Sequence, residues 1–567
     1  MRVSSEVVRV YKVVHTWTGI LSGMALFIAF YAGALTIFKE PLSRWATPPD
    51  PAAVHAPQVA LAEAQTLINR TLTGYPETAR GFQLNLSHED AATERLEWNK
   101  RPEGTDEHDL FAVQRFVATL DSGGAVEVRE ANHSGLPLFI DVLHRVVGLP
   151  VDDDATRLFM GVVAGLYFLA LVSGLIVLLP SLVKDLFALR VGPNLKRMWL
   201  DAHNVVGLGS LPFHLVIALT AAVFAFHDVI YMAQNQLVHE GKLGAALGGG
   251  PAEGEPRDPT EMLPPEQLVA KVTALAPDFE PTSLEYLQVT SPRASVRVWG
   301  QDAQAVHART PGGFAIVDPY SGRILTTEYL PGHQSVAGEV LATLFGVHFA
   351  TYGGMSIKWL YFLLGLLGAW LFYSGNLLWI ETRRKKAKQH LAGGALPTQR
   401  RTTTWMAAIT VGICLGAVCG ISAMIASTKW LHGHVADPNE WYSLVYYAVF
   451  FAALGWSCVR GGPRAAVELL RLAAVLTVAI PFTTVLAAAF PGLGLWYHQA
   501  PVALGVDAVA LLMALVFAWI ARATARRVYG GGPEDSVWTA SAPRPLPWFE
   551  TPVDATSVPV GNEASGS

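Results

Sequence analysis

Eight long apolar runs constrain the fold of this chain more than any other feature of its sequence. Each run has about 19 to 24 residues with almost no charge, and a helix of that length crosses a hydrocarbon core about 30 Å thick. Apolar residues make up 51% of the chain and charged residues only 15%, which is unusual for a water-soluble domain of this length. We therefore predict an α-helical polytopic membrane protein with about eight spans. The runs are Trp17–Phe38, Leu158–Leu179, Asn204–Phe226, Trp359–Ile380, Trp405–Ser427, Trp441–Val459, Leu472–Phe490 and Val502–Ala521.

Basic residues gather in the connections between these runs, and they predict the topology. Because cytoplasmic loops of membrane proteins carry an excess of Lys and Arg, the clusters place both termini in the cytoplasm and loops 40–157 and 228–357 outside. The first run is too long for the apolar region of a signal peptide, so we expect an uncleaved helix. The clusters are Arg2/Arg9/Lys12, Lys184/Arg190/Lys196/Arg197, Arg383/Arg384/Lys385/Lys386/Lys388, Arg460/Arg464 and Arg522/Arg526/Arg527.

The first 390 residues contain two similar halves. HTWTGILSG at 15–23 resembles HNVVGLGSL at 203–211, and both open an apolar run. In the outer loops, RFVATLDSGGAVEVRE (115–130) and GGFAIVDPYSGRILTTEYL (312–330) each have the pattern of a β-hairpin with an Asp- and Gly-containing turn. Helical patterns at 59–72 and 264–276 precede them. The sequence therefore predicts two parallel copies of helix, small α+β unit and helix, with functional sites between the copies.

These patterns give the predicted domain limits. The small α+β units are expected within Gly81–Glu130 and Val289–Tyr329, and the Gly- and Pro-rich stretch 248–261 is expected to be a flexible linker. The order is a first span (1–40), an outer domain (41–156), a second span (157–182), a basic inner loop with the third span (183–227), a second outer domain (228–356), the fourth span with a basic loop (357–390), a C-terminal extension of four helices (401–527) and a disordered tail (530–567).

Four histidines occupy matched positions in the two halves. His15 and His203 stand at the inner ends of the first and third spans, and His144 and His348 stand near the outer ends of the second and fourth. Two-fold repetition would bring these positions face to face as one pair on each side of the membrane. Zinc and copper usually take three or four ligands, whereas haem iron takes two axial ligands and suits a helical bundle. We therefore predict two b-type haems, although interfacial polar residues remain the simpler alternative.

Other residues near these positions are secondary candidates. Arg145, Lys12 and Arg197 are placed to pair with haem propionates. His214 lies about three turns after His203 on the same helix face, as an alternative ligand, a relay or a polar contact in the bundle. His227 is an alternative outer ligand. Glycines close to the histidines in sequence are expected to let a flat ring approach the backbone, among them Gly19, Gly23, Gly207 and Gly209.

The histidine-led helix starts, the returning histidines and the hairpin FAIVDPYSGRIL (314–325) resemble the PepSY-associated transmembrane helix family over roughly residues 5–385. That family includes bacterial iron-regulated inner-membrane proteins, some of which reduce ferric siderophores. The resemblance implies PepSY-type periplasmic domains, b-type haem held by the four histidines, and electrons delivered outward. The first outer domain is only weakly PepSY-like, and the last four helices lie outside the resemblance.

We therefore expect a transmembrane ferric-chelate (siderophore) reductase in the bacterial inner membrane. Its partners would be a ferric siderophore or other ferric chelate, the lipid bilayer and an external electron donor, with no nucleic acid. The inner loops lack a dinucleotide-binding G-x-G-x-x-G, so the donor would be quinol, reduced flavin or a cytoplasmic reductase. Two rival functions are a non-redox regulator of a periplasmic peptidase and a metal or proton transporter that uses Asp507 and the membrane histidines.

The predicted topology can be tested with single cysteines. A cysteine introduced at Ser122 or Gly322 should react with a membrane-impermeant thiol reagent in intact cells, because both positions lie in loops predicted to be outside. The native cysteines, Cys414, Cys419 and Cys458, do not lie in these loops. A site that is protected in intact cells yet reactive after lysis would contradict the topology.

Overall fold

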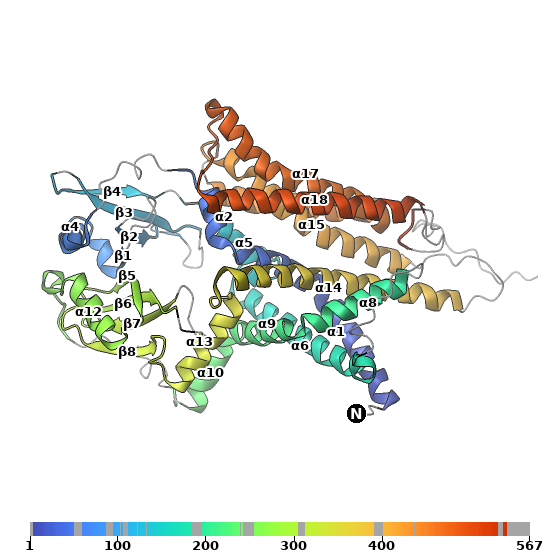
Figure 1. The fold of residues 1–567 in the computed structure, drawn as a ribbon, viewed down its shortest axis with the longest axis horizontal. Coiled ribbons are helices and arrows are strands. Elements are labelled where there is room, and N and C mark those ends of the chain that lie inside the picture. Colours follow the sequence, from blue (N-terminus) through green and yellow to red (C-terminus); the bar gives the residue numbers. More distant parts are fainter. Residues whose placement is uncertain are drawn as a thin grey trace, which may run out of the picture.

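The computed structural model places long helices side by side and an antiparallel sheet beyond one end of them (Figure 1). We call the sheet end of these helices the outer end and the opposite end the inner end. The structure describes residues 4–49, 59–86, 95–102, 104–105, 111–121, 123–131, 133–183, 195–238, 240–241, 254–303, 305, 312–389, 401–435, 437–530 and 537–540.

Seven helices in the described ranges are long and apolar enough to cross a membrane, and the count is eight if a bent pair of helices is taken as one span. These helices agree with the predicted polytopic architecture, and the chain is a multi-pass membrane protein. The straight spans are α1 (Ser5–Thr36), α6 (Asp154–Leu178), α14 (Gly354–Gln389), α15 (Arg401–Leu431), α16 (Pro438–Arg460), α17 (Gly462–Ala489) and α18 (Pro501–Gly530).

The third span is broken, which the sequence analysis did not predict. Helices α8 (Leu195–Gly209) and α9 (Leu211–Ala225) meet at an angle of 66° around Ser210. Pro212 stands in the first turn of α9 and has no N–H to donate to the preceding turn, so α8 cannot continue through it. The break gives the His203 half and the outer half of this span different directions.

Shorter helices lie at the outer ends of the spans (Figure 1). His144 and His348 belong to two of these, and not to the spans that follow. The first of the two ends where Val147 and Gly148 adopt positive φ angles of 52° and 82°, and the second ends at Ala350 with a φ of 53°. The short helices are α2 (Lys39–Ala46), α5 (Leu136–Arg145), α10 (His227–Leu237) and α13 (Val336–Phe349).

The two outer segments share one eight-stranded antiparallel sheet of order β4-β3-β2-β1-β5-β6-β7-β8. The predicted hairpins are confirmed as β3–β4 and β7–β8, and the predicted helical stretches contain α4 (Ala64–Gly74) and α12 (Pro265–Leu275). The two units are joined, because β1 pairs with β5, and the sequence analysis did not predict this pairing. The strands are β1 (Gly81–Asn85), β2 (Leu96–Lys100), β3 (Gln114–Leu120), β4 (Val126–Glu130), β5 (Glu280–Leu287), β6 (Ser295–Gln301), β7 (Gly313–Val317) and β8 (Ile324–Tyr329).

The sheet has two different faces. Helices α4 and α12 cover the face that points away from the membrane helices, over a core that includes Leu84, Leu284 and Val298 (Figure 1). Gln83 and Glu285 form the central pair of the β1–β5 seam and lie on the opposite face, because side chains alternate along a strand. The seam is therefore the place where the two repeats meet, above the outer ends of the spans.

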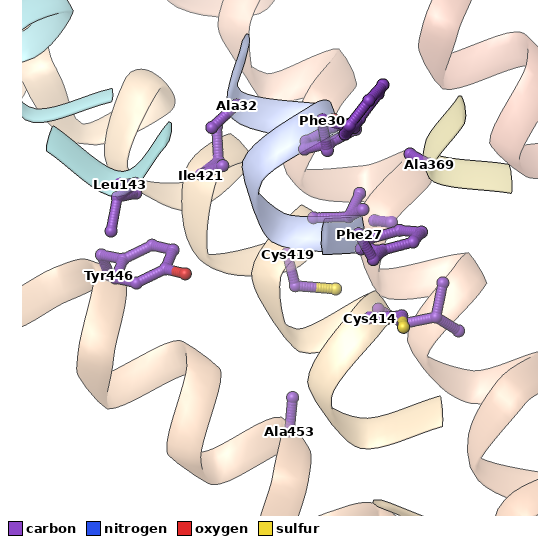
Figure 2. Packing of buried hydrophobic residues seen from close by; sticks show 14 of the residues in the cluster. Phe27, Phe30, Ala32, Leu143, Ala369, Cys414, Cys419, Ile421, Tyr446 and Ala453 are labelled. Atoms are coloured by element: carbon purple, nitrogen blue, oxygen red, sulfur yellow. The ribbon is translucent and has the colours of Figure 1, made fainter. Parts of the chain in front are cut away.

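The C-terminal helices α15–α18 pack beside the first repeat. Figure 2 shows α1 residues Phe27 and Ala32 next to Cys419 and Ile421 of α15, within one buried apolar cluster. Part of the tail also folds onto these helices, since Val537 and Trp538 are buried. This corrects the expectation of disorder for residues 537–540 of the 530–567 tail. The rest of the tail after Gly530, and linker residues 248–253, lie outside the described residues.

The β1–β5 seam predicts a specific crosslink. Cysteines replacing Gln83 and Glu285 should form a disulfide under mild oxidation, because directly opposed residues of antiparallel strands have Cα atoms about 4.5–5.5 Å apart, within disulfide range. Gln83 and Arg297 are separated by one further strand, so the same substitutions there should give little crosslink. Mass spectrometry of the digested protein reads out both. Equal crosslinking of the two pairs would contradict the seam.

Candidate functional site

The inner histidine pair is held by the returning span of each repeat. The Nδ1–H of His15 donates to the carbonyl oxygen of Ala170 on α6 at 2.8 Å. The Nδ1 of His203 lies 3.0 Å from the hydroxyl of Ser374 on α14. That hydroxyl donates its own proton to the Leu371 carbonyl at 3.0 Å, so it accepts from His203. The two imidazoles lie close enough to interact electrostatically, as the repeat predicts.

The outer histidine pair is held by the first span of each repeat. The Nδ1–H of His144 donates to the Ala29 carbonyl on α1 at 2.8 Å. The Nδ1–H of His348 donates to the hydroxyl of Thr220 on α9 at 2.8 Å, since that hydroxyl gives its proton to the Val216 carbonyl. The two ring centroids are 6.3 Å apart and the ring planes differ by 37°.

These contacts fix the same tautomer in all four rings. Because each Nδ1 carries the proton, each Nε2 keeps its lone pair and can act as a ligand. A hydrogen bond from the far nitrogen of the ring is the arrangement found when a histidine binds a metal. Two imidazoles bound to opposite sides of one metal ion through bonds of about 2 Å have ring centres about 6 Å apart. The spacing of the outer pair fits such a shared ligand.

Glycines on neighbouring helices make room for three of the four rings. A Cβ added at Gly174 would lie 2.9 Å from His15, and one at Gly33 would lie 2.7 Å from His144. A Cβ at Gly375 would lie 3.4 Å from His203. These are not the glycines that the sequence analysis chose, because the close approach is between helices and not along one helix. Gly19 and Gly209 face open space, Gly23 faces Asn376, and Gly207 faces Leu371.

The four histidines meet as pairs. Within the ranges that the structure describes, no group of three or more His, Cys, Asp or Glu side chains could hold a metal ion.

A family model described as the PepSY-associated TM region matches residues 13–382, which include both repeats and all four histidines. The chain belongs to this family. The matched region ends before α15, so the C-terminal helices are an addition to the family frame. Among curated proteins, no match was found.

Between the two pairs lies a fifth histidine. His214 is fully buried, its Nδ1 lies 2.6 Å from the hydroxyl of Tyr167, and its Nε2 has no hydrogen-bond partner. The rings of Phe30 and Phe213 surround it, with centroids at 5.6 and 5.4 Å. His214 precedes Thr220 by about 9 Å along α9, so it stands at a depth between the inner and outer pairs. Of the roles predicted for His214, the structure supplies the polar contact.

The remaining predicted residues are engaged elsewhere. Both ring nitrogens of His227 are in local contacts, with the Phe224 carbonyl at 2.6 Å and with Asp228 at 3.1 Å. Arg145 forms an ion pair with Asp152 at 2.6 Å, and Arg197 forms one with Asp201 at 3.3 Å. Lys12 is exposed at the inner end of α1. The predicted propionate contacts of these three cations stay predictions.

The glycine contacts predict opposite effects for two similar substitutions on α6. Gly174→Ala should lower the thermal unfolding temperature, because overpacking against His15 costs about 1–3 kcal/mol. Gly165→Ala should leave it unchanged or raise it, since a Cβ there meets nothing within 4 Å and alanine favours helix by about 1 kcal/mol. Thermal unfolding in detergent measures both. Equal shifts would mean that Gly174 is not a ring contact.

Proposed function

We propose that this protein holds two b-type haems, one between His15 and His203 and one between His144 and His348. We further propose that it is a transmembrane ferric-chelate reductase of the bacterial inner membrane, which passes electrons from a separate donor to ferric siderophores or similar chelates outside. One observation carries the proposal. The outer histidines face each other across the repeats, the inner two interact electrostatically, and all four donate from Nδ1, so that each Nε2 lone pair is available.

The residues around each pair suit a flat, apolar cofactor with two axial ligands. The Nδ1 hydrogen bonds orient the rings and raise their basicity as ligands, and the glycines beside them leave space that a Cβ would fill. Apolar rings line the outer pair, with Phe224 at 5.0 Å from His348. When bound, haem supplies one-electron oxidation and reduction of its iron.

The two pairs lie at different depths, which supports transfer across the membrane. Helix α1 carries His15 in its first half, and Ala29, which accepts from His144, lies about 21 Å further along its axis. The protein's task in such a transfer is to hold two ligand pairs at fixed positions in a water-poor interior. Tyr167, His214 and Phe30 fill the space between them with aromatic side chains.

The outer pair lies next to the segment that would meet the chelate. The helices carrying it, α5 and α13, follow β4 and β8 closely in the chain, and the face of the sheet that carries Gln83 and Glu285 points toward them (Figure 1). Reduction of Fe(III) to Fe(II) weakens a chelate of hard oxygen ligands and needs no acid or base from the protein. The donor would be quinol, reduced flavin or a cytoplasmic reductase.

An absorption spectrum of the purified protein decides between this function and its rivals. A redox protein with paired histidine ligands should be red and show sharp low-spin haem bands after dithionite reduction. A peptidase regulator or a transporter that uses Asp507 should be colourless. A colourless preparation that does not take up added haem would exclude the proposal.

The four histidines make a sharper prediction. His15→Ala and His203→Ala should each remove the inner haem, and His144→Ala and His348→Ala should each remove the outer one, because a non-covalent six-coordinate haem needs both imidazoles. Haem per protein should therefore fall from about two to about one in each variant. His227→Ala serves as the control and should keep both. Full haem content with an unchanged spectrum in any of the four would exclude that residue as a ligand, and His214 would be tested next.

A further inference from the structure

The C-terminal helices contact both ends of α5, the helix that carries His144. Before its first turn, the hydroxyl of Ser134 lies 3.0 Å from the hydroxyl of Tyr442 on α16. The same Ser134 oxygen accepts from the N–H of Leu136, the first residue of the helix, at 3.3 Å. After its last turn, the hydroxyl of Tyr447 donates to the Gly148 carbonyl at 3.2 Å. Two tyrosines from one helix thus hold the two flanks of α5.

Between these ends, one face of α5 packs on the same C-terminal helix. The ring of Phe139 meets Tyr446 and Tyr447 with centroids at 5.8 and 6.4 Å. Leu143 is fully buried and points toward Tyr446 (Figure 2). The next residue, His144, points to the other side and donates to Ala29 of α1. The helix is therefore fixed between α16 and α1.

A buried polar chain anchors the C-terminal helices to α2, which packs against α5. Lys429 donates to the hydroxyl of Thr484 at 2.8 Å, and Thr484 donates to the carboxylate of Asp507 at 3.0 Å. The indole N–H of Trp45 on α2 donates to the same carboxylate at 2.9 Å, and the Lys429 ammonium lies 4.2 Å from the Trp45 ring. Because an unpaired charge in this interior is costly, these hydrogen bonds hold α15, α17 and α18 against α2.

Two more contacts extend this anchor to the start of α5. The indole N–H of Trp496 donates to the Trp45 carbonyl at 3.2 Å, and His498 donates to the Thr47 carbonyl at 2.8 Å. The Ser134 N–H in turn donates to the Thr47 hydroxyl at 3.2 Å. The segment Trp496–His498 therefore holds the connection between α2 and α5.

The helix carrying the second outer histidine is supported differently. Helix α13 packs against α9 and meets β8. Its residues Val336, Val340 and Phe349 are 80%, 56% and 43% exposed, whereas Leu136, Phe139 and Leu143 of α5 are each at most 3% exposed. The two histidines of the outer pair therefore have hydrogen bonds of equal length, whereas the helices that carry them are packed unequally.

We infer that the C-terminal four-helix unit is a positioning element for the outer histidine His144, with Tyr442 and Tyr447 as its contact points on α5. The inference rests on the proposed function in one respect, since His144 is taken as a haem ligand. Loss of both contacts would loosen α5 and change the orientation of the His144 ring in the outer pair. The inner pair, which has no ligand on α5, would not change.

The chain offers a matched control for this inference. Tyr446 lies between the two tyrosines on α16, is fully buried, and its hydroxyl has no hydrogen-bond partner. Tyr446→Phe therefore removes the same atom from the same helix without removing a hydrogen bond. Comparison with the double variant Tyr442→Phe/Tyr447→Phe separates the two contacts from a general effect of losing a buried hydroxyl.

The first measurement is hydrogen exchange of the full-length protein in detergent. Amides of α5 should exchange roughly thirtyfold faster in the double variant, because two hydrogen bonds of about 1 kcal/mol each no longer oppose local opening. Amides of α13 should be unaffected, and Tyr446→Phe should match the unmodified protein. Unchanged exchange of α5 in the double variant would overturn the inference whether or not the protein contains haem.

The second measurement is the electron paramagnetic resonance spectrum of the oxidised protein, which reports the relative orientation of two axial imidazoles. In the double variant the signal of the outer site should shift while the signal of the inner site stays unchanged. Equal shifts of both signals, or of neither, would overturn the positioning role. Faster exchange of α5 in a protein that binds no haem would support the contact of α16 with α5 and refute the proposed function alone.

Discussion

An imidazole inside a helical bundle must find an acceptor for its N–H proton, and the structure depends on how four half-buried histidines do so. A buried donor without an acceptor costs about 1–3 kcal/mol, and most acceptors inside a helical bundle are already used by the helices. In the first repeat the acceptors of the histidine N–H groups are the backbone carbonyls of Ala170 and Ala29, which can accept a second hydrogen bond. The second repeat uses the hydroxyls of Ser374 and Thr220, which donate their own protons to their own helices.

Each histidine is therefore oriented within its own repeat and meets its partner from the other repeat. His15 and His203 bond to the returning span, and His144 and His348 bond to the first span. The same division appears in the sheet, where each repeat builds four strands and the two sets meet at β1 and β5. Equivalent residues of the two repeats thus meet at three levels along the molecule: at the β1–β5 seam, at the outer histidine pair and at the inner histidine pair.

Sequence reasoning found the features that repeat along the chain and missed those that depend on contacts between distant segments. Apolar length predicted the spans, alternation predicted the β7–β8 hairpin, and matched positions predicted that His144 meets His348. The β1–β5 seam was missed because β5 contains Pro281 and a polar, irregular pattern, and because pairing between repeats leaves no local signal. Gly174 and Gly33 were missed for the same reason, since each serves a ring on another helix.

The C-terminal contacts show a further limit of sequence reasoning. Asp507 was noticed as an ionisable residue in a membrane segment, and its partners, Trp45 and Thr484, could not be found without the fold. The break at Ser210 was signalled only by Pro212, which the apolar run obscured. Residues whose role is set by their own helix were predictable, whereas residues whose role is set by a neighbouring helix were not.

The seam has a consequence for any shorter version of this chain. A single repeat would expose the whole edge of its first strand, with unpaired N–H and C=O groups, and would carry only half of each histidine pair. Such a half could complete both features at once by associating with a second copy of itself about a two-fold axis, the commonest symmetry of protein oligomers. The present chain therefore has the organisation of a dimer whose two subunits are joined covalently. Joining them frees the two halves to differ, and the extension α15–α18 beside the first repeat is one such difference.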